Sequence, residues 1–371
     1  MELSLWEKRS LLKADVIIVG AGITGLSVAA ALTEGDDSLD IIVLERGLLP
    51  TGASTRNAGF ACFGSLTELL SDSYSMGEDK MLELVEMRWK GLNRLKSRLG
   101  EERIGFEPKG GFELLNSQND SALHKLDAIN SSLNDIFKSV VYRLQPNLQN
   151  TFGFEGFSHV VQNQFEGQLD TGKLMYGLWK YCAERGVRII TGATVLNYNA
   201  QPSSIEVNTT DYSFQCKSLA LCTNAFSKEL FNVELVPGRG IVLVAEPTRP
   251  LQFQGSFHYD EGYYYFRDFN GKIIFGGGRN RDLAGEETSS FALNQKILAH
   301  LKEELTKKII PKTDFTIEDS WAGIMAFGDT KWPIIKEIAP GIVAGVRLGG
   351  MGVAIGSQVG HTLSQMILER L

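Results

Sequence analysis

Three glycines near the start of the chain have the spacing that binds a dinucleotide. They are Gly20, Gly22 and Gly25, with Ile23 and Thr24 between the last two. The first glycine permits a tight turn, the second lets a pyrophosphate approach the backbone, and the third lets a helix pack close to a strand. The free N–H groups at the start of that helix would then hold the phosphates.

The residues around this motif supply the rest of a βαβ unit. An apolar run at 16–19 precedes the motif, and a second run at 41–44 ends in Glu45, twenty residues past Gly25, with Arg46 next. A carboxylate at that place can accept hydrogen bonds from a ribose. The context therefore predicts that the chain binds an ADP-containing dinucleotide.

A membrane span or a secretory signal is the alternative explanation of this segment. Residues 16–32 carry no charge and follow basic residues. Three glycines within six positions would weaken a spanning helix, however, and the run matches the dinucleotide motif residue by residue. We therefore expect a cytoplasmic protein with no membrane partner.

Two further glycine-rich segments favour FAD over NAD. The run 52–59 is small and rich in backbone donors, and Gly349-Gly350-Met351-Gly352 precedes a predicted helix. The positive end of such a helix can stabilise the negative charge of a reduced flavin. The candidate contacts in the first run are Ala53, Ser54, Arg56, Asn57, Ala58 and Gly59.

Composition excludes several other classes of protein. The net charge is −7 with no block of Lys or Arg, which argues against nucleic acid as a partner. The cysteines form no CxxC and the histidines no HxxxH or HExxH pair, so we expect no metal site and reduced cysteines. A GxSxG motif is also absent, which argues against a serine hydrolase.

Periodicity along the 371 residues predicts an α/β fold with two domains. Helical spacing marks 78–99, 120–138, 170–185 and 291–309, whereas 241–246, 262–267 and 272–276 read as antiparallel strands with a hairpin turn at Asn270-Gly271. We predict a Rossmann-like cofactor domain made of 1–95, 156–238 and 329–371, into which an antiparallel-sheet substrate domain is inserted as 96–155 and 239–328.

At this point the chain resembles a known family. Four segments carry the resemblance, and they are GASTRNAGF (52–60), LCTNAFS (221–227), YYYFRDFNGKIIFGGG (263–278) and RLGGMGVAIG (347–356). They resemble segments of FAD-dependent oxidoreductases of the D-amino acid oxidase, glycine oxidase and sarcosine oxidase superfamily. The γ-glutamylputrescine oxidase-like branch is the most similar in pattern. The resemblance covers nearly the whole chain.

The resemblance implies where FAD lies. The backbone around Val195 would hold adenine, and Ser54–Asn57 with 350–353 would hold the part from the pyrophosphate to the flavin. Some members attach flavin through a His or Cys near the first loop. This loop has no His, and we expect Cys62 to be buried filler, so FAD should bind noncovalently. Further expected contacts are Thr223, Asn224, Arg347 and Val353.

Candidate substrate residues follow the same matching segments. We single out Tyr264, Trp321, Met325 and Arg279 as the catalytic set, although core packing is the competing explanation for each aromatic residue. Arg239 and Arg279 are candidate anion-binding groups, with structural pairing as the alternative. We expect His258 to be a histidine whose hydrogen bonds are satisfied within its strand.

Two departures from the family pattern bear on the substrate. Met325 stands where the glycine oxidase and D-amino acid oxidase branches carry the arginine that binds the substrate carboxylate, and Ala354 stands where sarcosine oxidases carry a lysine. Both departures weaken a simple α-amino acid substrate.

We therefore expect oxidation of a C–N bond in a small amine or amino acid. Hydride would pass to flavin N5, the imine would hydrolyse, and oxygen or another acceptor would reoxidise the flavin. Three alternatives remain. They are a dehydrogenase of the same family that uses a quinone or protein acceptor, a non-catalytic flavin-binding protein, and an NAD-linked dehydrogenase.

Overall fold

A six-stranded sheet contains the predicted βαβ unit at its centre. The computed structural model, which describes residues 3–371, has the strand order β18-β19-β12-β1-β2-β8. All neighbours pair in parallel except β18, which is antiparallel to β19. The strands are β1 (Val16–Val19), β2 (Ile41–Glu45), β8 (Arg188–Thr191), β12 (Ser218–Leu221), β18 (Ile334–Ala339) and β19 (Ile342–Val346). Segments from the start, middle and end of the chain thus form one sheet.

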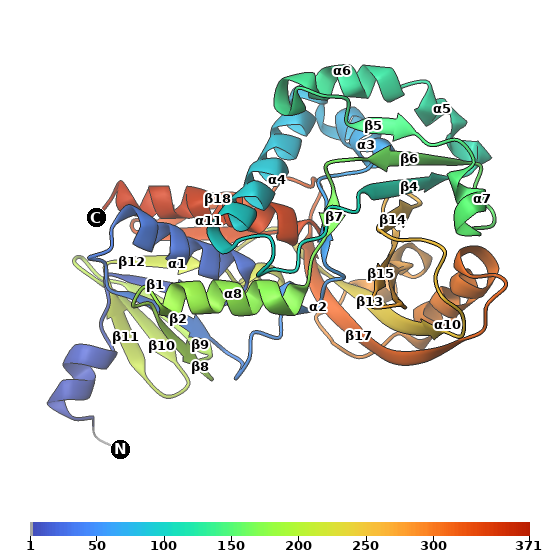
Figure 1. Ribbon diagram of the computed structural model, residues 1–371. Helices are drawn as coiled ribbons and strands as arrows, with labels where there is room; N and C mark the ends of the chain where they lie inside the picture. Colours follow the sequence, from blue (N-terminus) through green and yellow to red (C-terminus); the bar gives the residue numbers. More distant parts are fainter. Residues whose placement is uncertain (1–2) are drawn as a thin grey trace.

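Helices cover one face of this sheet and a small antiparallel sheet covers the other (Figure 1). The helices are α1 (Ile23–Gly35), α8 (Thr171–Ala183) and α11 (Gly352–Leu368), and the small sheet comprises β9 (Val195–Ala200), β10 (Ile205–Thr209) and β11 (Ser213–Cys216). Apolar residues surround α1 because it is buried between the sheet and its neighbouring helices.

Glycines let the first and last of these helices approach closely. A Cβ on Gly356 would lie 2.8 Å from Cγ2 of Ile23, and one on Gly360 would lie 2.6 Å from Cβ of Ser27. The uncharged segment 16–32 is therefore a buried strand and helix of the sheet layer, and reading it as a membrane span is wrong. Within residues 3–371, no helix is long and apolar enough to cross a membrane.

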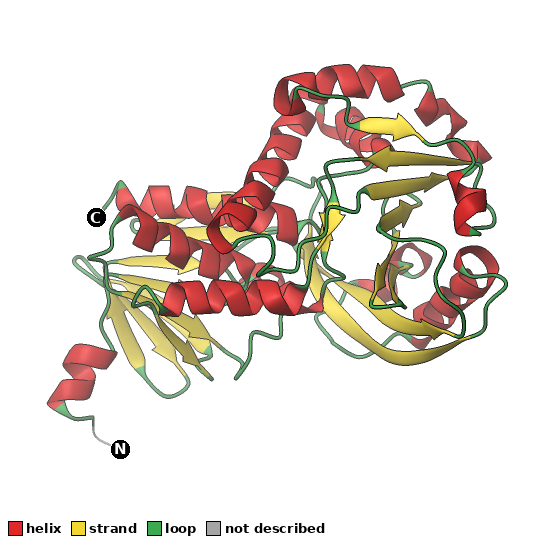
Figure 2. Ribbon diagram, in the orientation of Figure 1, coloured by secondary structure: helices red, strands yellow, loops and turns green. Residues whose placement is uncertain are grey.

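A second, eight-stranded sheet forms the other half of the molecule, with the order β17-β13-β16-β15-β14-β4-β6-β5 (Figure 2). Its core is aromatic, and Phe257 stacks on Phe266 and Phe112 with ring centroids 4.8 and 5.0 Å apart. Asn270 and Gly271 adopt positive φ angles of 50° and 80°, as the predicted hairpin turn requires. The strands are β4 (Gly111–Leu115), β5 (Tyr142–Leu144), β6 (His159–Asn163), β13 (Val236–Pro247), β14 (Ser256–Tyr259), β15 (Tyr264–Phe269), β16 (Lys272–Gly277) and β17 (Phe315–Phe327).

The remaining elements connect and cover the two sheets. The helices are α2 (Ala53–Arg56), α3 (Leu66–Met76), α4 (Glu78–Leu99), α5 (Asp120–Leu123), α6 (Leu126–Phe137), α7 (Leu148–Phe152), α9 (Leu283–Glu286) and α10 (Gln295–Glu304). Short helical segments lie at Glu7–Leu11, Ser117–Asn119, Asn224–Glu229, Arg279–Arg281 and Leu305–Ile309, and β3 (Phe60–Ala61) pairs with β7 (Gly167–Gln168).

The two sheets confirm the predicted fold class of a Rossmann-like unit with an inserted sheet domain. The predicted boundary at 155/156 would place β6 in the cofactor domain, yet β6 pairs with β4 and β5 in the eight-stranded sheet. The domain boundaries themselves stay a prediction.

Candidate functional site

A cavity of about 630 Å³ extends from the carboxyl ends of β1 and β2 to the eight-stranded sheet. Gly20 and Glu45 line it from the first sheet, whereas Val242 and Tyr265 line it from the second. Ligands of open α/β sheets bind beyond the carboxyl ends of the strands, and the volume suits a small-molecule site.

The glycine motif opens the N-terminus of α1 to this cavity. Gly20 adopts a φ of 103°, and a Cβ on Gly22 would lie 2.9 Å from Oγ of Ser54. The backbone N–H of Ile23 donates to that hydroxyl at 2.9 Å. Gly25 does not line the cavity, but a Cβ there would lie 1.9 Å from the carbonyl oxygen of Gly20, which is the close packing expected of the third glycine.

The Glu45 carboxylate is held in place at the end of β2. Oε2 accepts from the N–H of Ala21 and Oε1 from that of Gly47, both at 3.0 Å. Next to it, the guanidinium of Arg46 lies 3.8 Å from the ring centroid of Phe226. These contacts fix a carboxylate at the cavity wall, where it suits a ribose.

Three predicted cofactor residues have structural roles. Arg56 lines the cavity, yet its guanidinium donates to the carbonyl oxygens of Thr51 at 2.9 Å and Ala322 at 3.0 Å, and so joins the loop to β17. Arg347 does not line the cavity, because its side chain donates to the carbonyl oxygen of Trp332 at 3.0 Å. Gly59 is also absent from the wall, since its backbone packs against Leu169.

The other predicted cofactor residues gather around the cavity, and α1 and α11 both begin there. Two positive helix ends, close-approach glycines and a fixed carboxylate suit the negative pyrophosphate and the ribose of FAD. Contact of each residue with FAD stays a prediction. The lining residues are Gly20, Gly22, Ile23, Thr24, Glu45, Arg46, Ala53, Ser54, Arg56, Asn57, Ala58, Val195, Thr223, Asn224, Gly349, Gly350, Met351, Gly352 and Val353.

Tyr264 does not lie at the substrate end of the cavity, so its prediction as a catalytic residue is wrong. Its side chain is only 2% exposed and belongs to the core of the eight-stranded sheet. Tyr263 and Tyr265 line the cavity instead, because successive side chains of a strand point to opposite faces. Burial raises the pKa of Tyr265 to about 12, so its hydroxyl is protonated.

Trp321 is also wrong as a cavity residue. Its Nε1–H donates to the carbonyl oxygen of Arg56 at 2.9 Å, which fastens β17 to the cofactor loop. Met325, four residues later on the same strand, does line the cavity. The position at which the family pattern has an arginine, and this chain Met325, therefore lies in the cavity wall.

The two candidate anion-binding arginines differ. Arg239 is buried and forms a double ion pair with Glu286, with Nε–Oε2 at 3.0 Å and Nη2–Oε1 at 2.7 Å, so its structural alternative is confirmed. Arg279 lines the cavity, and its guanidinium lies 3.7 Å from the ring centroid of Phe327. No acidic residue within 3–371 forms an ion pair with Arg279.

Comparison with known proteins decides the family. Residues 15–366 match the family described as FAD dependent oxidoreductase, also called DAO. The chain belongs to this family. The predicted resemblance is therefore confirmed, and the cofactor is FAD. That FAD binds noncovalently stays a prediction.

Three relatives illustrate the likeness. The chain is 23% identical to the "Probable oxidoreductase OrdL" of Haemophilus influenzae over 96% of this chain and 84% of that protein. It is 31% identical to the "Gamma-glutamylputrescine oxidoreductase" of Escherichia coli, over 30% of this chain and 26% of that protein. The structure of L-proline dehydrogenase from P. horikoshii superposes with a TM-score of 0.79 at 17% identity, over 96% and 94% of the two chains. This last match shows a shared fold.

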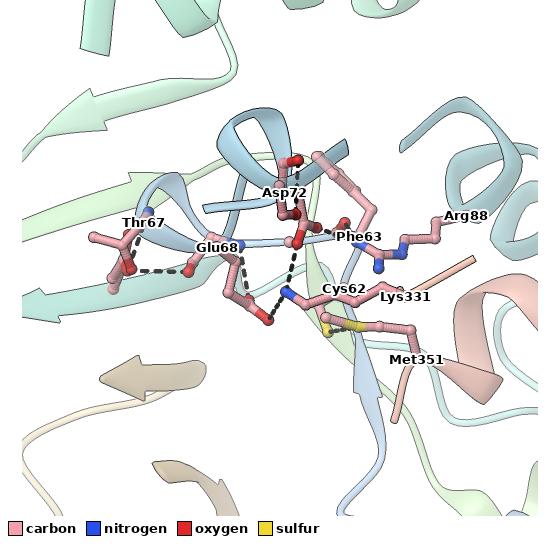
Figure 3. Close-up of polar contacts among 12 residues, drawn as sticks. Cys62, Phe63, Thr67, Glu68, Asp72, Arg88, Lys331 and Met351 are labelled. Carbon is pink, nitrogen blue, oxygen red and sulfur yellow. Dashed lines mark hydrogen bonds and ion pairs between the residues drawn. The ribbon is translucent and has the colours of Figure 1, made fainter. Parts of the chain in front are cut away.

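In this FAD-dependent oxidoreductase, the sequence analysis missed an acidic group at the far end of the cavity. Glu68 and Asp72 of α3 line the wall, with Lys331 between them (Figure 3). Two signals were available. Ser65 and Glu68 have the spacing of a capping box, and like charges four residues apart weaken a helix unless something pairs with them.

The expectation that the hydrogen bonds of His258 are satisfied within its strand is wrong. It is 7% exposed and lines the cavity, and no hydrogen bond reaches either ring nitrogen from the described part of the chain. Burial lowers its pKa, which favours the neutral ring. Cys62 is buried as expected, with Sγ 3.7 Å from Sδ of Met351, and burial raises the pKa of its thiol well above the ordinary value.

Proposed function

We propose that this flavoprotein oxidises a C–N bond in a small amine that has no α-carboxylate. The observation that carries the proposal is Met325 in the cavity wall, where an arginine would pair with a substrate carboxylate. The other candidate cations are largely engaged, since Arg56 binds carbonyl oxygens and Arg239 binds Glu286. Burying a substrate carboxylate without a paired cation costs roughly several kcal/mol of binding free energy. Arg279 is the one group that favours the amino acid alternative.

The walls of the cavity prepare the amine for oxidation. Apolar groups such as Phe60, Ile324 and Val353 line it and disfavour a charged ammonium at the reacting position. The nitrogen therefore binds with its lone pair free. The protonated hydroxyl of Tyr265 can donate a hydrogen bond, and the neutral ring of His258 can accept one. The bound cofactor would supply the hydride acceptor for the carbon beside this nitrogen, and water would hydrolyse the imine product.

The electron acceptor forms the second part of the proposal. We infer reoxidation by oxygen, with a quinone or a protein as the alternative acceptor. The relative named as a dehydrogenase of L-proline supports keeping that alternative. The relative named for γ-glutamylputrescine supports an amine substrate, although it matches only 30% of this chain.

The test is a screen of flavin reduction without oxygen. Purified protein is mixed with primary and secondary amines, polyamines, glycine, sarcosine and D-alanine, and flavin absorbance is followed. Amines should reduce the flavin faster than the amino acids. Faster reduction by an amino acid would overturn the proposal, and no reduction by any compound would favour a non-catalytic flavin protein. Admission of air or of a quinone to the reduced protein then separates oxidase from dehydrogenase.

A further inference from the structure

We propose that Glu68, Asp72 and His258 form a subsite for a second, protonated nitrogen of the substrate, which makes this protein selective for diamines and polyamines. The inference rests on the proposed amine oxidation, and it adds the recognition of a charge remote from the oxidised bond. Its site is the end of the cavity that α3 and β14 enclose.

Glu68 presents an oxygen to the cavity. Its side chain is only 7% exposed, and Oε2 accepts from the N–H of Ser65 at 3.1 Å, which caps α3. Oε1 accepts no hydrogen bond from residues 3–371, and the nearest cation is Nζ of Lys331 at 3.7 Å. Because Oε1 faces the cavity without a donor from the described residues, a ligand that donates there gains a charged hydrogen bond.

Asp72 lies one helical turn further along α3 and is buried as well. Oδ1 lies 2.8 Å from Nζ of Lys331. Figure 3 marks this ion pair with a dashed line. Oδ2 has no hydrogen-bond partner among the described residues, and Nη1 of Arg88 is 3.9 Å away. Lys331 and Arg88 together balance the two carboxylates, so Glu68, whose Oε1 has no hydrogen bond from the described residues, is the carboxylate better placed to receive a ligand.

His258 supplies an acceptor from the opposite wall. No hydrogen bond reaches its ring from the described residues, its Nε2 lies 4.0 Å from Oε2 of Glu166, and Glu68 is the charged group that acts on it most strongly. A neutral imidazole nitrogen and the Glu68 carboxylate can accept two of the three N–H donors of an ammonium.

The charges and geometry favour an organic cation. Glu68, Asp72, Glu261 and Asp329 line this part of the cavity, against which Lys331 is the lining cation. A metal ion is a poor alternative, because no three His, Cys, Asp or Glu side chains within residues 3–371 are placed to hold one.

The Nζ atom of Lys331 occupies the position where we expect the substrate ammonium. It lies between β17 and β18 in the segment 328–331, which lines the cavity, and its side chain is 36% exposed. An exposed lysine pays side-chain entropy to reach two buried carboxylates, whereas a bound substrate brings its second nitrogen to them directly. We infer that the substrate ammonium displaces Lys331.

The experiment compares 1,4-diaminobutane with butylamine, which has the same carbon chain and lacks the second nitrogen. Dissociation constants and limiting rates come from anaerobic flavin reduction. The wild type should bind the diamine more tightly. Glu68→Gln keeps an acceptor for Ser65 but removes the charge, and should weaken diamine binding about tenfold to a hundredfold, so that the preference over butylamine falls toward one.

Two further variants keep the test decisive. Glu83→Gln, at an exposed position of α4, is the matched control and should leave the preference unchanged. Lys331→Ala removes the competing ammonium and should lower the dissociation constant of the diamine. If Glu68→Gln fails to fold or to hold FAD, Asp72→Asn takes its place with the same expectation.

The outcomes separate this inference from the proposed function. Equal binding of the two amines by the wild type, or an equal effect of Glu68→Gln on both, would overturn the subsite. If neither amine reduces the flavin, calorimetric titration with 1,4-diaminobutane measures binding alone. Diamine binding that depends on Glu68 then supports the subsite while the proposed reaction fails, and its absence refutes the subsite.

Discussion

Tyr264 stacks on Tyr259 with ring centroids 4.6 Å apart and the ring planes inclined by only 2°. The stack directs the Tyr264 hydroxyl to Nε2 of His300, at 2.8 Å, within the core of the eight-stranded sheet. The next residue, Tyr265, points into the cavity. Of these neighbouring tyrosines, one packs in the core and the other lines the cavity.

Phenylalanine substitutions should separate these two roles. Tyr264→Phe removes the hydrogen bonds of the hydroxyl with Nε2 of His300 at 2.8 Å and with Nε of Arg281 at 3.3 Å. It should lower the free energy of unfolding by about 0.5–1.5 kcal/mol for each bond, while amine-dependent flavin reduction stays normal. Tyr265→Phe should change the rate or affinity of flavin reduction and leave stability nearly unaltered. Denaturant unfolding and anaerobic kinetics measure the two effects, and an exchange of the two phenotypes would disprove the assignment.

Substitutions at the glycine motif should act on FAD binding. A valine at Gly22 places atoms between α1 and Oγ of Ser54, where the pyrophosphate is predicted, and should abolish FAD binding. Glu45→Ala removes charged hydrogen bonds worth about 1.5–3 kcal/mol each, so affinity should fall roughly tenfold to a few hundredfold. Reconstitution of apoprotein, followed by the quenching of FAD fluorescence, gives both values. Normal affinity in Gly22→Val would contradict the site.

The substrate charge can be tested at Met325 and Arg279. Met325→Arg should not improve amine oxidation and should create weak activity toward amino acids, because it restores a cation in the wall. Arg279→Ala should leave amine oxidation in place. Efficient oxidation of a simple amino acid by the wild type, lost in Arg279→Ala, would show that the carboxylate-binding group has moved to Arg279. Steady-state kinetics with matched amines and amino acids decides the matter.

Two buried carboxyl groups should make stability depend on pH. Desolvation raises the pKa of Glu166 to about 8 and that of Glu113 to about 7, from an ordinary value of 4.5. The folded protein therefore keeps protons that the unfolded chain loses. Their stabilising effect is complete below about pH 4.5, declines as the pH rises, and is lost above about pH 8.

Glu166→Gln should reduce this decline. In the wild type, Oε1 of Glu166 accepts hydrogen bonds from the N–H groups of Phe63, at 3.0 Å, and Gly64, at 3.3 Å. The amide oxygen of glutamine can still accept both. Melting temperatures of wild type, Glu166→Gln and the exposed control Glu83→Gln, measured between pH 4.5 and 8, test the expectation. A decline that is as steep in Glu166→Gln as in the wild type would exclude this carboxyl as a cause.

Most of the predicted cofactor residues line one cavity because that prediction depends on local backbone. Gly20, Gly22 and Glu45 act through turns, close approach and a strand end, all of which are visible within one βαβ unit. The substrate half depends on partners from distant segments. The amino-acid sequence alone does not indicate that Glu286 pairs with Arg239, or that Lys331 contacts Asp72.

Strand residues with both faces covered set a second limit. Tyr264 and Tyr265 are the same residue type on one strand, so alternation alone says that they differ in face without saying which one faces the cavity. His258 shows the same limit for polar groups. Whether a buried histidine forms a hydrogen bond depends on which side chains reach it from other strands. Within residues 3–371, no side chain forms a hydrogen bond with the ring of His258.

The contact of Gly356 and Gly360 with α1 has a consequence for biosynthesis. The first helix of the cofactor domain packs against its last helix, and the N-termini of both open on the flavin cavity. A nascent chain that still lacks residues 352–368 holds only part of the phosphate-binding backbone. Flavin capture should therefore wait until residues 352–368 have been made and have packed against α1, long after the glycine motif has been synthesised.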